Sequence, residues 1–101
     1  MSKLTKQQIF ERLNEESKNL KKQFSVSSLG LFGSFAHNQA GEDSDIDLLV
    51  RLDKPTFRNY MGLKHHFEKE FGRKVDLVME GTVKPRLRCK IDSEVEYAEE
   101  F

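Results

Sequence analysis

Apolar residues recur with two different periods along this chain, and the periods predict both helices and strands. Spacing near 3.6 residues marks an N-terminal segment and the segment 57–71. Short apolar runs bounded by polar turn residues mark three strands, which cover residues 29–32, 46–52 and 74–79. The pattern favours an α+β (α/β) fold in which helices flank a small mixed sheet of three or four strands.

The N-terminal segment carries the signals of one charged helix with a single apolar stripe. Thr5 and Gln8 have the spacing of a capping box, and Leu4 with Ile9 has the spacing of a hydrophobic staple. The stripe consists of Ile9, Leu13, Leu20 and Phe24. A polar joint at residues 25–28 is expected to separate this helix from the first strand.

The segment 57–71 has the clearest helical pattern in the chain. Pro55-Thr56 marks its start, and Gly72 is suited to its C-cap. Its aromatic residues keep the helical period, so we expect them in the core. The adjacent His65 and His66 would point about 100° apart on a helix, which is poor for joint metal ligation, and we expect neither to act directly.

Length and composition narrow the classes of protein that remain. With 101 residues, the chain is expected to form a single domain, 1–101. Lys and Arg total 17, as do Asp and Glu, so no global field favours nucleic acid as a partner. Cys89 is the single cysteine, which excludes an internal disulfide and fits the reducing cytoplasm. No apolar run resembles a signal peptide or a membrane span.

Candidate chemistry concentrates in two short motifs. Gly33-Ser34 follows a predicted strand and opens a predicted short helix at 34–40, whose first amides would offer an anion site. After ten intervening residues come Asp45 and Asp47, which share one face of the next strand because successive side chains alternate. Paired carboxylates repel each other, and a divalent cation such as Mg²⁺ resolves that conflict. The polar loop 38–44 would hang over such a site.

A third acidic residue interrupts the apolar strand 74–79. Asp76 would be costly to bury there without a partner. It could be an edge-strand or helix-capping residue, or a third metal ligand beside Asp45 and Asp47. We favour the ligand.

These motifs resemble those of the polymerase β-like nucleotidyltransferase superfamily, and most closely its minimal nucleotidyltransferase (MNT) antitoxins, partners of HEPN toxins. The resemblance implies a nucleotidyltransferase-like fold and two Mg²⁺ ions held by Asp45, Asp47 and Asp76. It also implies that Gly33 and Ser34 bind the phosphates of ATP. The implied activity is transfer of AMP to a tyrosine of a cognate HEPN ribonuclease toxin, which silences it.

Two features leave alternatives open. Relatives often have a basic residue and a glycine where this chain has His37 and Asn38, which would weaken the contact with phosphate. A helix is expected from about Pro85, and its basic residues would meet a nucleotide, a partner or only water. These residues are Lys84, Arg86, Arg88 and Lys90. The alternative functions are a non-catalytic binding antitoxin, or a nucleotidyltransferase acting on RNA or a small molecule.

Overall fold

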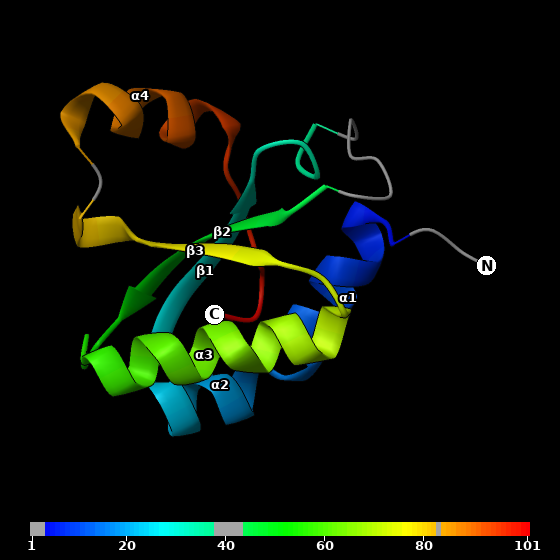
Figure 1. Ribbon diagram of the computed structural model, residues 1–101, viewed down its shortest axis with the longest axis vertical. Coiled ribbons are helices and arrows are strands. Elements are labelled where there is room, and N and C mark those ends of the chain that lie inside the picture. Colours follow the sequence, from blue (N-terminus) through cyan, green and yellow to red (C-terminus); the bar gives the residue numbers. More distant parts are fainter. Residues whose placement is uncertain (1–3, 38–43, 83) are drawn as a thin grey trace.

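The computed structural model describes residues 4–37, 44–82 and 84–101, which form a four-stranded sheet with helices on both faces (Figure 1). The helices are α1 (Lys6–Glu15), α2 (Ser17–Phe24), α3 (Phe57–Phe71) and α4 (Pro85–Glu94), with a short 3-10 helix η1 (Glu80–Thr82). The strands are β1 (Val26–Phe32), β2 (Ile46–Leu52), β3 (Val75–Met79) and β4 (Glu96–Tyr97). The expected α+β fold is confirmed.

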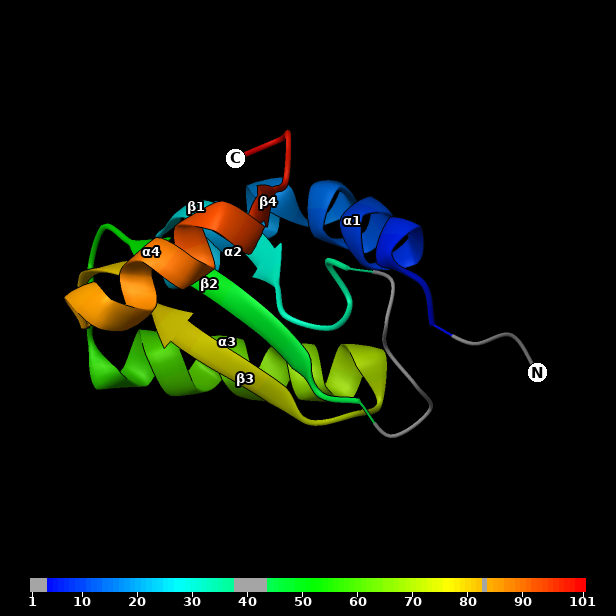
Figure 2. The same ribbon diagram turned by 90° about the horizontal axis from the view of Figure 1, so that it is seen from above.

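The sheet is mixed, and its strand order is β3-β2-β1-β4. β1 runs antiparallel to both β2 and β4, whereas β2 and β3 run parallel and are joined by the crossover helix α3. Figure 1 shows α2 and α3 on one side of the sheet and α4 on the other. In Figure 2, α4 accordingly lies in front of the strands and α3 behind them.

The main core lies between the sheet and helices α1, α2 and α3. Alternate residues of the central strand β2, Ile46, Leu48 and Val50, are fully buried on this side. Because side chains alternate along a strand, the intervening Asp47 projects from the opposite face. The same alternation in β3 buries Val75 and leaves Asp76 exposed. The apolar pattern therefore sends the acidic side chains to the face that α1, α2 and α3 leave uncovered.

The N-terminal segment forms two helices, so the expectation of one continuous helix was wrong. The capping box is confirmed, since Gln8 N donates to Thr5 Oγ1 at 3.2 Å and Thr5 N donates to Gln8 Oε1 at 3.0 Å. The break falls at Glu16, whose φ of −94° and ψ of 3° depart from helical values. The apolar stripe continues across the break, and this continuity is why the sequence pattern did not reveal it.

Strand β1 begins earlier than its apolar residues indicated. The predicted polar joint at residues 25–28 was wrong from Val26 onward, because main-chain pairing with β2 needs no apolar side chain. The pairing is irregular between Val26 and Ser28, and Ser27 Oγ donates to Arg51 O at 3.1 Å there. A bulge of this kind is compatible with the polar residues that hid the strand.

Strand β4 was not expected from the sequence. It contains only Glu96 and Tyr97, which pair with Leu31 and Gly30 of β1. A Cβ at Gly30 would lie 2.5 Å from Val95 Cγ2 and 3.1 Å from the Tyr97 ring. The missing side chain at Gly30 therefore lets the C-terminal segment pack directly onto the sheet.

Helix α3 matches its predicted limits. Asn59 N donates to Thr56 Oγ1 at 3.1 Å, and Gly72 closes the helix with a φ of 65°. Phe67 is buried as expected, but Phe57, the first residue of the helix, is 80% exposed, so its core assignment was wrong. Phe57 keeps the helical period, but burial of its side chain also requires another element of the fold to pack against it.

Side chains of α3 and η1 form hydrogen bonds with main-chain groups along β3, which is an edge strand of the sheet. Val75 N donates to Glu68 Oε2 at 3.2 Å, and Tyr60 Oη donates to Leu77 O at 2.6 Å. Thr82 Oγ1 donates to Met79 O at 2.9 Å. Occupied main-chain groups protect an edge strand against pairing with another chain.

The C-terminal helix begins at Pro85 as predicted, and the four basic residues of this segment are all exposed.

The prediction of a short helix from Ser34 was wrong, because residues 33–37 form consecutive turns. A single helix-like bond, from His37 N to Gly33 O at 3.3 Å, remains. The rest of that predicted helix, and residues 38–43 of the predicted loop, lie outside the described residues. In the part of the chain that is described, no helix is long and apolar enough to cross a membrane.

Candidate active site

The turn after β1 and the start of β2 meet at Gly33 and Asp47. Gly33 has a φ of 74°, which L residues with a side chain rarely adopt. A Cβ at this position would overlap Asp47 Oδ2 and lie 3.0 Å from its Cγ. Glycine is therefore required twice, for the backbone conformation and for the close approach of the turn to the carboxylate.

Two of the three predicted aspartates lie directly beside each other. Asp47 and Asp76 are register partners in the parallel β2–β3 pair, so their side chains leave the same face of the sheet. Asp45 immediately precedes β2 and is exposed. The chain thus brings together carboxylates from two strand starts, although 29 positions separate Asp47 from Asp76 in the sequence.

The electrostatics of this group centre on Asp47. Burial, together with the negative charges of Asp76 and Asp45, raises the pKa of Asp47 from 3.8 to about 6, and burial is the largest of these causes. Among the residues that the structure describes, no Lys, Arg or His forms an ion pair with any of the three aspartates. Within the described ranges, the three aspartates thus carry negative charge that no ion pair neutralises.

Comparison with known proteins supplies the family. A family model described as a nucleotidyltransferase domain matches residues 11–100. The chain belongs to the nucleotidyltransferase domain family. The protein adenylyltransferase MntA of Thermococcus cleftensis is 35% identical over 98 residues, which cover 96% of this chain and 99% of that protein. The expectation of a nucleotidyltransferase enzyme is confirmed.

Solved structures agree with this assignment. A minimal nucleotidyltransferase shares 32% identity with a TM-score of 0.78, over 95% of this chain and 98% of that one. The MNT antitoxin complex with the tri-AMPylated HEPN toxin of Shewanella oneidensis matches with a TM-score of 0.63 and 16% identity, over 88% of this chain and 71% of that one. A toxin–antitoxin structure with AMP-PNP has a TM-score of 0.70 at 18% identity, over 84% and 71%. At such identities the two complexes support the fold alone.

The residues of this nucleotidyltransferase domain fit a hard divalent cation. All three candidate ligands are carboxylates, and oxygen donors of this type suit Mg²⁺. Burial and the neighbouring carboxylates both disfavour the ionised form of Asp47, and a cation would offset the repulsion between these carboxylates. A bound cation would also favour the ionised form of Asp47, so its binding should release a proton near pH 6.

A fourth carboxylate, Glu94, was missed in the sequence. It lies at the end of α4, its charge adds to those that raise the pKa of Asp47, and its Oε1 is 3.5 Å from His37 Nε2. His37 stands where the family resemblance led us to expect a basic residue. No sequence signal singles out Glu94, because it belongs to an acidic run that is typical of a solvated surface.

Arg73 was also missed, and it connects the two motif segments. Its Nη1 donates to Ser44 O at 3.0 Å, just before Asp45, and its guanidinium lies 5.3 Å from the centre of the Phe35 ring, just after Ser34. Arg73 itself stands two residues before β3. We assign it a positioning role, since one planar cation contacts both sides of the site.

Replacing Arg73 by Met is expected to lower kcat for nucleotidyl transfer by about 10- to 100-fold, because small displacements of reacting groups are costly. Arg73→Lys should recover part of this loss through a hydrogen bond to Ser44 O. Steady-state kinetics that separate kcat from KM would measure both effects, with exposed Lys74→Met as the neighbouring control. Equal kcat values for Arg73→Met and the unmodified protein would contradict the positioning role.

Proposed function

We propose that this protein is a Mg²⁺-dependent adenylyltransferase that moves AMP from ATP to a tyrosine of a HEPN-type ribonuclease toxin and thereby acts as its antitoxin. The observation that carries the proposal is the pairing of Asp47 with Asp76 beside Gly33. The Thermococcus relative, a protein adenylyltransferase, supports a protein as the acceptor. The choice of a HEPN toxin follows the example of the Shewanella antitoxin, which shares this fold and is bound to a tri-AMPylated HEPN toxin. The whole chain, 1–101, would act as one minimal domain in the cytoplasm.

Each site residue has a defined task in this reaction. Asp45, Asp47 and Asp76 would hold two Mg²⁺ ions, which when bound stabilise charge on the attacking and leaving oxygens. Ser34 and the amides around Gly33 would hold the β- and γ-phosphates, because they donate hydrogen bonds without adding repulsive charge.

The proposed reaction is a displacement at the α-phosphorus of ATP. The tyrosine oxygen forms a bond to the α-phosphorus of ATP, and the bond from that phosphorus to the bridging oxygen of the β-phosphate breaks. Pyrophosphate leaves with the electron pair of the broken bond. Asp76, which is exposed at the start of β3, would take the tyrosine proton.

The chain's charge balance disfavours RNA as the acceptor. Its 17 basic and 17 acidic residues give no net field, and affinity for nucleic acid depends on clustered positive charge. The exposed basic residues of α4 are followed by acidic ones on the same helix, and Arg88 Nε lies 3.7 Å from Asp92 Oδ2. A protein acceptor is therefore the better match.

Incubation of a candidate HEPN-type partner, sought first among the neighbouring genes, with the enzyme, ATP and Mg²⁺ should add one or more AMP units to that partner. Intact-protein mass spectrometry would measure the addition, and tandem spectra should place it on a tyrosine. The Asp45→Asn/Asp47→Asn variant should give no addition. A stable complex without any mass increase would instead support a binding antitoxin, and AMP on an RNA 3′ end or a small molecule would reassign the acceptor.

A further inference from the structure

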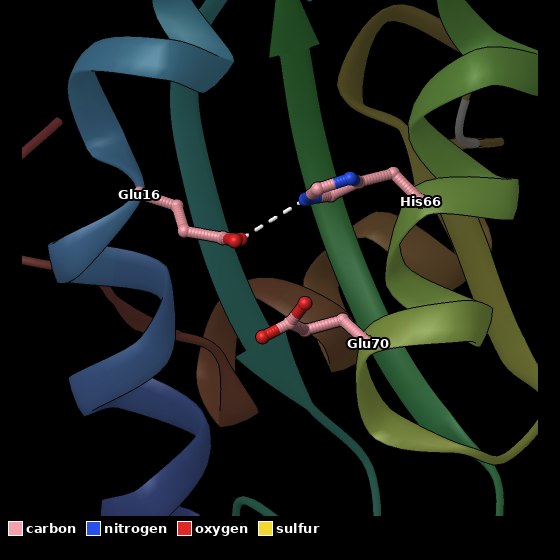
Figure 3. A group of neighbouring side chains, drawn as sticks. All are labelled: Glu16, His66 and Glu70. Atoms are coloured by element: carbon pink, nitrogen blue, oxygen red, sulfur yellow. Dashed lines mark hydrogen bonds and ion pairs between the residues drawn. The ribbon is translucent and has the colours of Figure 1, made fainter.

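A second group of ligand-type side chains lies in the helical layer, on the other side of the sheet from the aspartates. Glu16 comes from the break between α1 and α2, whereas His66 and Glu70 stand one turn apart on α3 (Figure 3). In Figure 3 all three side chains point into the space between the two helical segments. All three are partly buried.

The donor atoms of these residues are already close together. One ligand atom from each lies within 4.8 Å of the other two, and His66 Nε2 is 3.0 Å from Glu16 Oε2. Ligand distances of about 2.0–2.2 Å around one zinc ion place donor atoms about 3.3 Å apart. Small rotations of the two flexible glutamate side chains would close the remaining gap.

Local backbone geometry fixes the directions of these side chains. Residues i and i+4 share a face of a helix, so His66 and Glu70 project together from α3. The non-helical conformation of Glu16 turns its side chain toward them. The His66 ring also packs 5.9 Å from the ring of Phe24 in α2, which restricts its orientation. A histidine held in this way loses little freedom when it binds an ion.

The charges around this group leave room for a cation. Glu15, Glu16 and Glu70 contribute three negative charges, and Arg12 contributes one positive charge. Arg12 forms ion pairs with Glu70 and, at 3.5 Å, with Glu15. Attraction by Glu70 raises the pKa of Arg12, with smaller contributions from Glu15 and Glu16. The surplus of two negative charges equals the charge of one divalent ion.

We propose that Glu16, His66 and Glu70 form a binding site for one divalent transition-metal ion of the Zn²⁺ class. One imidazole nitrogen and two carboxylate oxygens suit Zn²⁺, Co²⁺ or Ni²⁺, whereas Mg²⁺ prefers oxygen alone. Water completes the fourth position. Arg12 keeps its pair with Glu15 and the second oxygen of Glu70. The ion connects the α1–α2 junction to α3 and so braces the helical layer behind the sheet.

Calorimetry with Zn²⁺ on the full chain tests this site. The titration uses the Asp45→Asn/Asp47→Asn variant, so that the aspartates at the other face of the sheet do not bind the added Zn²⁺. One ion per chain is expected, and His66→Gln should weaken binding by at least about 10-fold. His65→Gln is the matched control, since His65 is the exposed neighbour on the same helix, and it should leave affinity unchanged. Zn²⁺ at 100 times its Kd should raise Tm by about 10 °C or more, unless His66 is replaced.

A second measurement does not depend on how the variants fold. Crystals of the unmodified protein soaked in Zn²⁺ should show an anomalous peak between Glu16, His66 and Glu70. Equal affinities of the His65→Gln and His66→Gln proteins would overturn the proposal, as would an ion found only at the aspartates or nowhere. These outcomes are independent of AMP transfer, so failure here leaves the proposed enzymatic function intact.

Discussion

Replacing Asp45 and Asp47 together by Asn is expected to abolish AMP transfer, with a loss of at least about 10³-fold in kcat. Asn keeps the size of each side chain but removes the charge that would hold the cation. Asp76 alone would retain too little negative charge to compensate. Transfer of labelled AMP to the partner protein would measure the loss. Exposed Asp53, just beyond the same strand, provides the control variant Asp53→Asn, which should keep full activity.

The single variant Asp47→Asn should at the same time stabilise the metal-free protein above pH 6. The folded protein raises the pKa of Asp47 from 3.8 to about 6, so the native state holds a proton that the unfolded chain releases. The stability of the unmodified protein therefore falls as pH rises from about 4 to 6. Because this carboxyl group is only partly buried, we expect a gain from Asn of about 1 kcal/mol at pH 7.5.

Thermal unfolding in EDTA at pH 7.5 and at pH 4 separates the two effects. The variant should have the higher Tm at pH 7.5, by about 4–8 °C, and no such advantage at pH 4, where Asp47 is protonated in the native state. Added Mg²⁺ should raise the Tm of the unmodified protein and leave that of the double variant unchanged. A lower Tm for Asp47→Asn in EDTA would show that the carboxylate has a structural role instead.

The second large effect is expected at Gly33. Alanine there would adopt a φ of 74° and place its Cβ against the Asp47 carboxylate. We expect a loss of at least about 10²-fold in kcat, because Asp47 must move away from Asp76. The free energy of unfolding should fall by about 1–3 kcal/mol through backbone strain and the steric clash.

Gly72→Ala provides the matched control for this substitution. Gly72 has a similar φ of 65°, yet a Cβ there would meet no atom of the described residues within 4 Å, its two chain neighbours apart. It should therefore cost about 1 kcal/mol of stability and leave AMP transfer unchanged. If both variants lost activity equally, general destabilisation rather than displacement of Asp47 would explain the effect. Denaturant unfolding and transfer kinetics on the same samples provide the comparison.

The elements that could be predicted are those whose signals are local. Capping residues define the ends of α3, and the alternation around Ile46 and Leu48 identifies β2 and the face on which Asp47 lies. Local signals did not predict the elements that form by pairing with segments distant in the sequence. Main-chain pairing with β2 extends β1 through polar residues, and pairing with Gly30 creates β4, so neither needs an apolar pattern of its own.

The candidate site divides in the same way. The sequence by itself determined the motif of Gly33, Ser34, Asp45, Asp47 and Asp76, because each of these residues stands within or directly beside a predicted strand or turn. Only the tertiary structure decided that Arg73 contacts both motif segments, that Glu94 lies near Asp47, and that Glu16 meets His66. Those contacts join residues far apart in the sequence, and their positions depend on how strands pair and helices pack, which no local periodicity specifies.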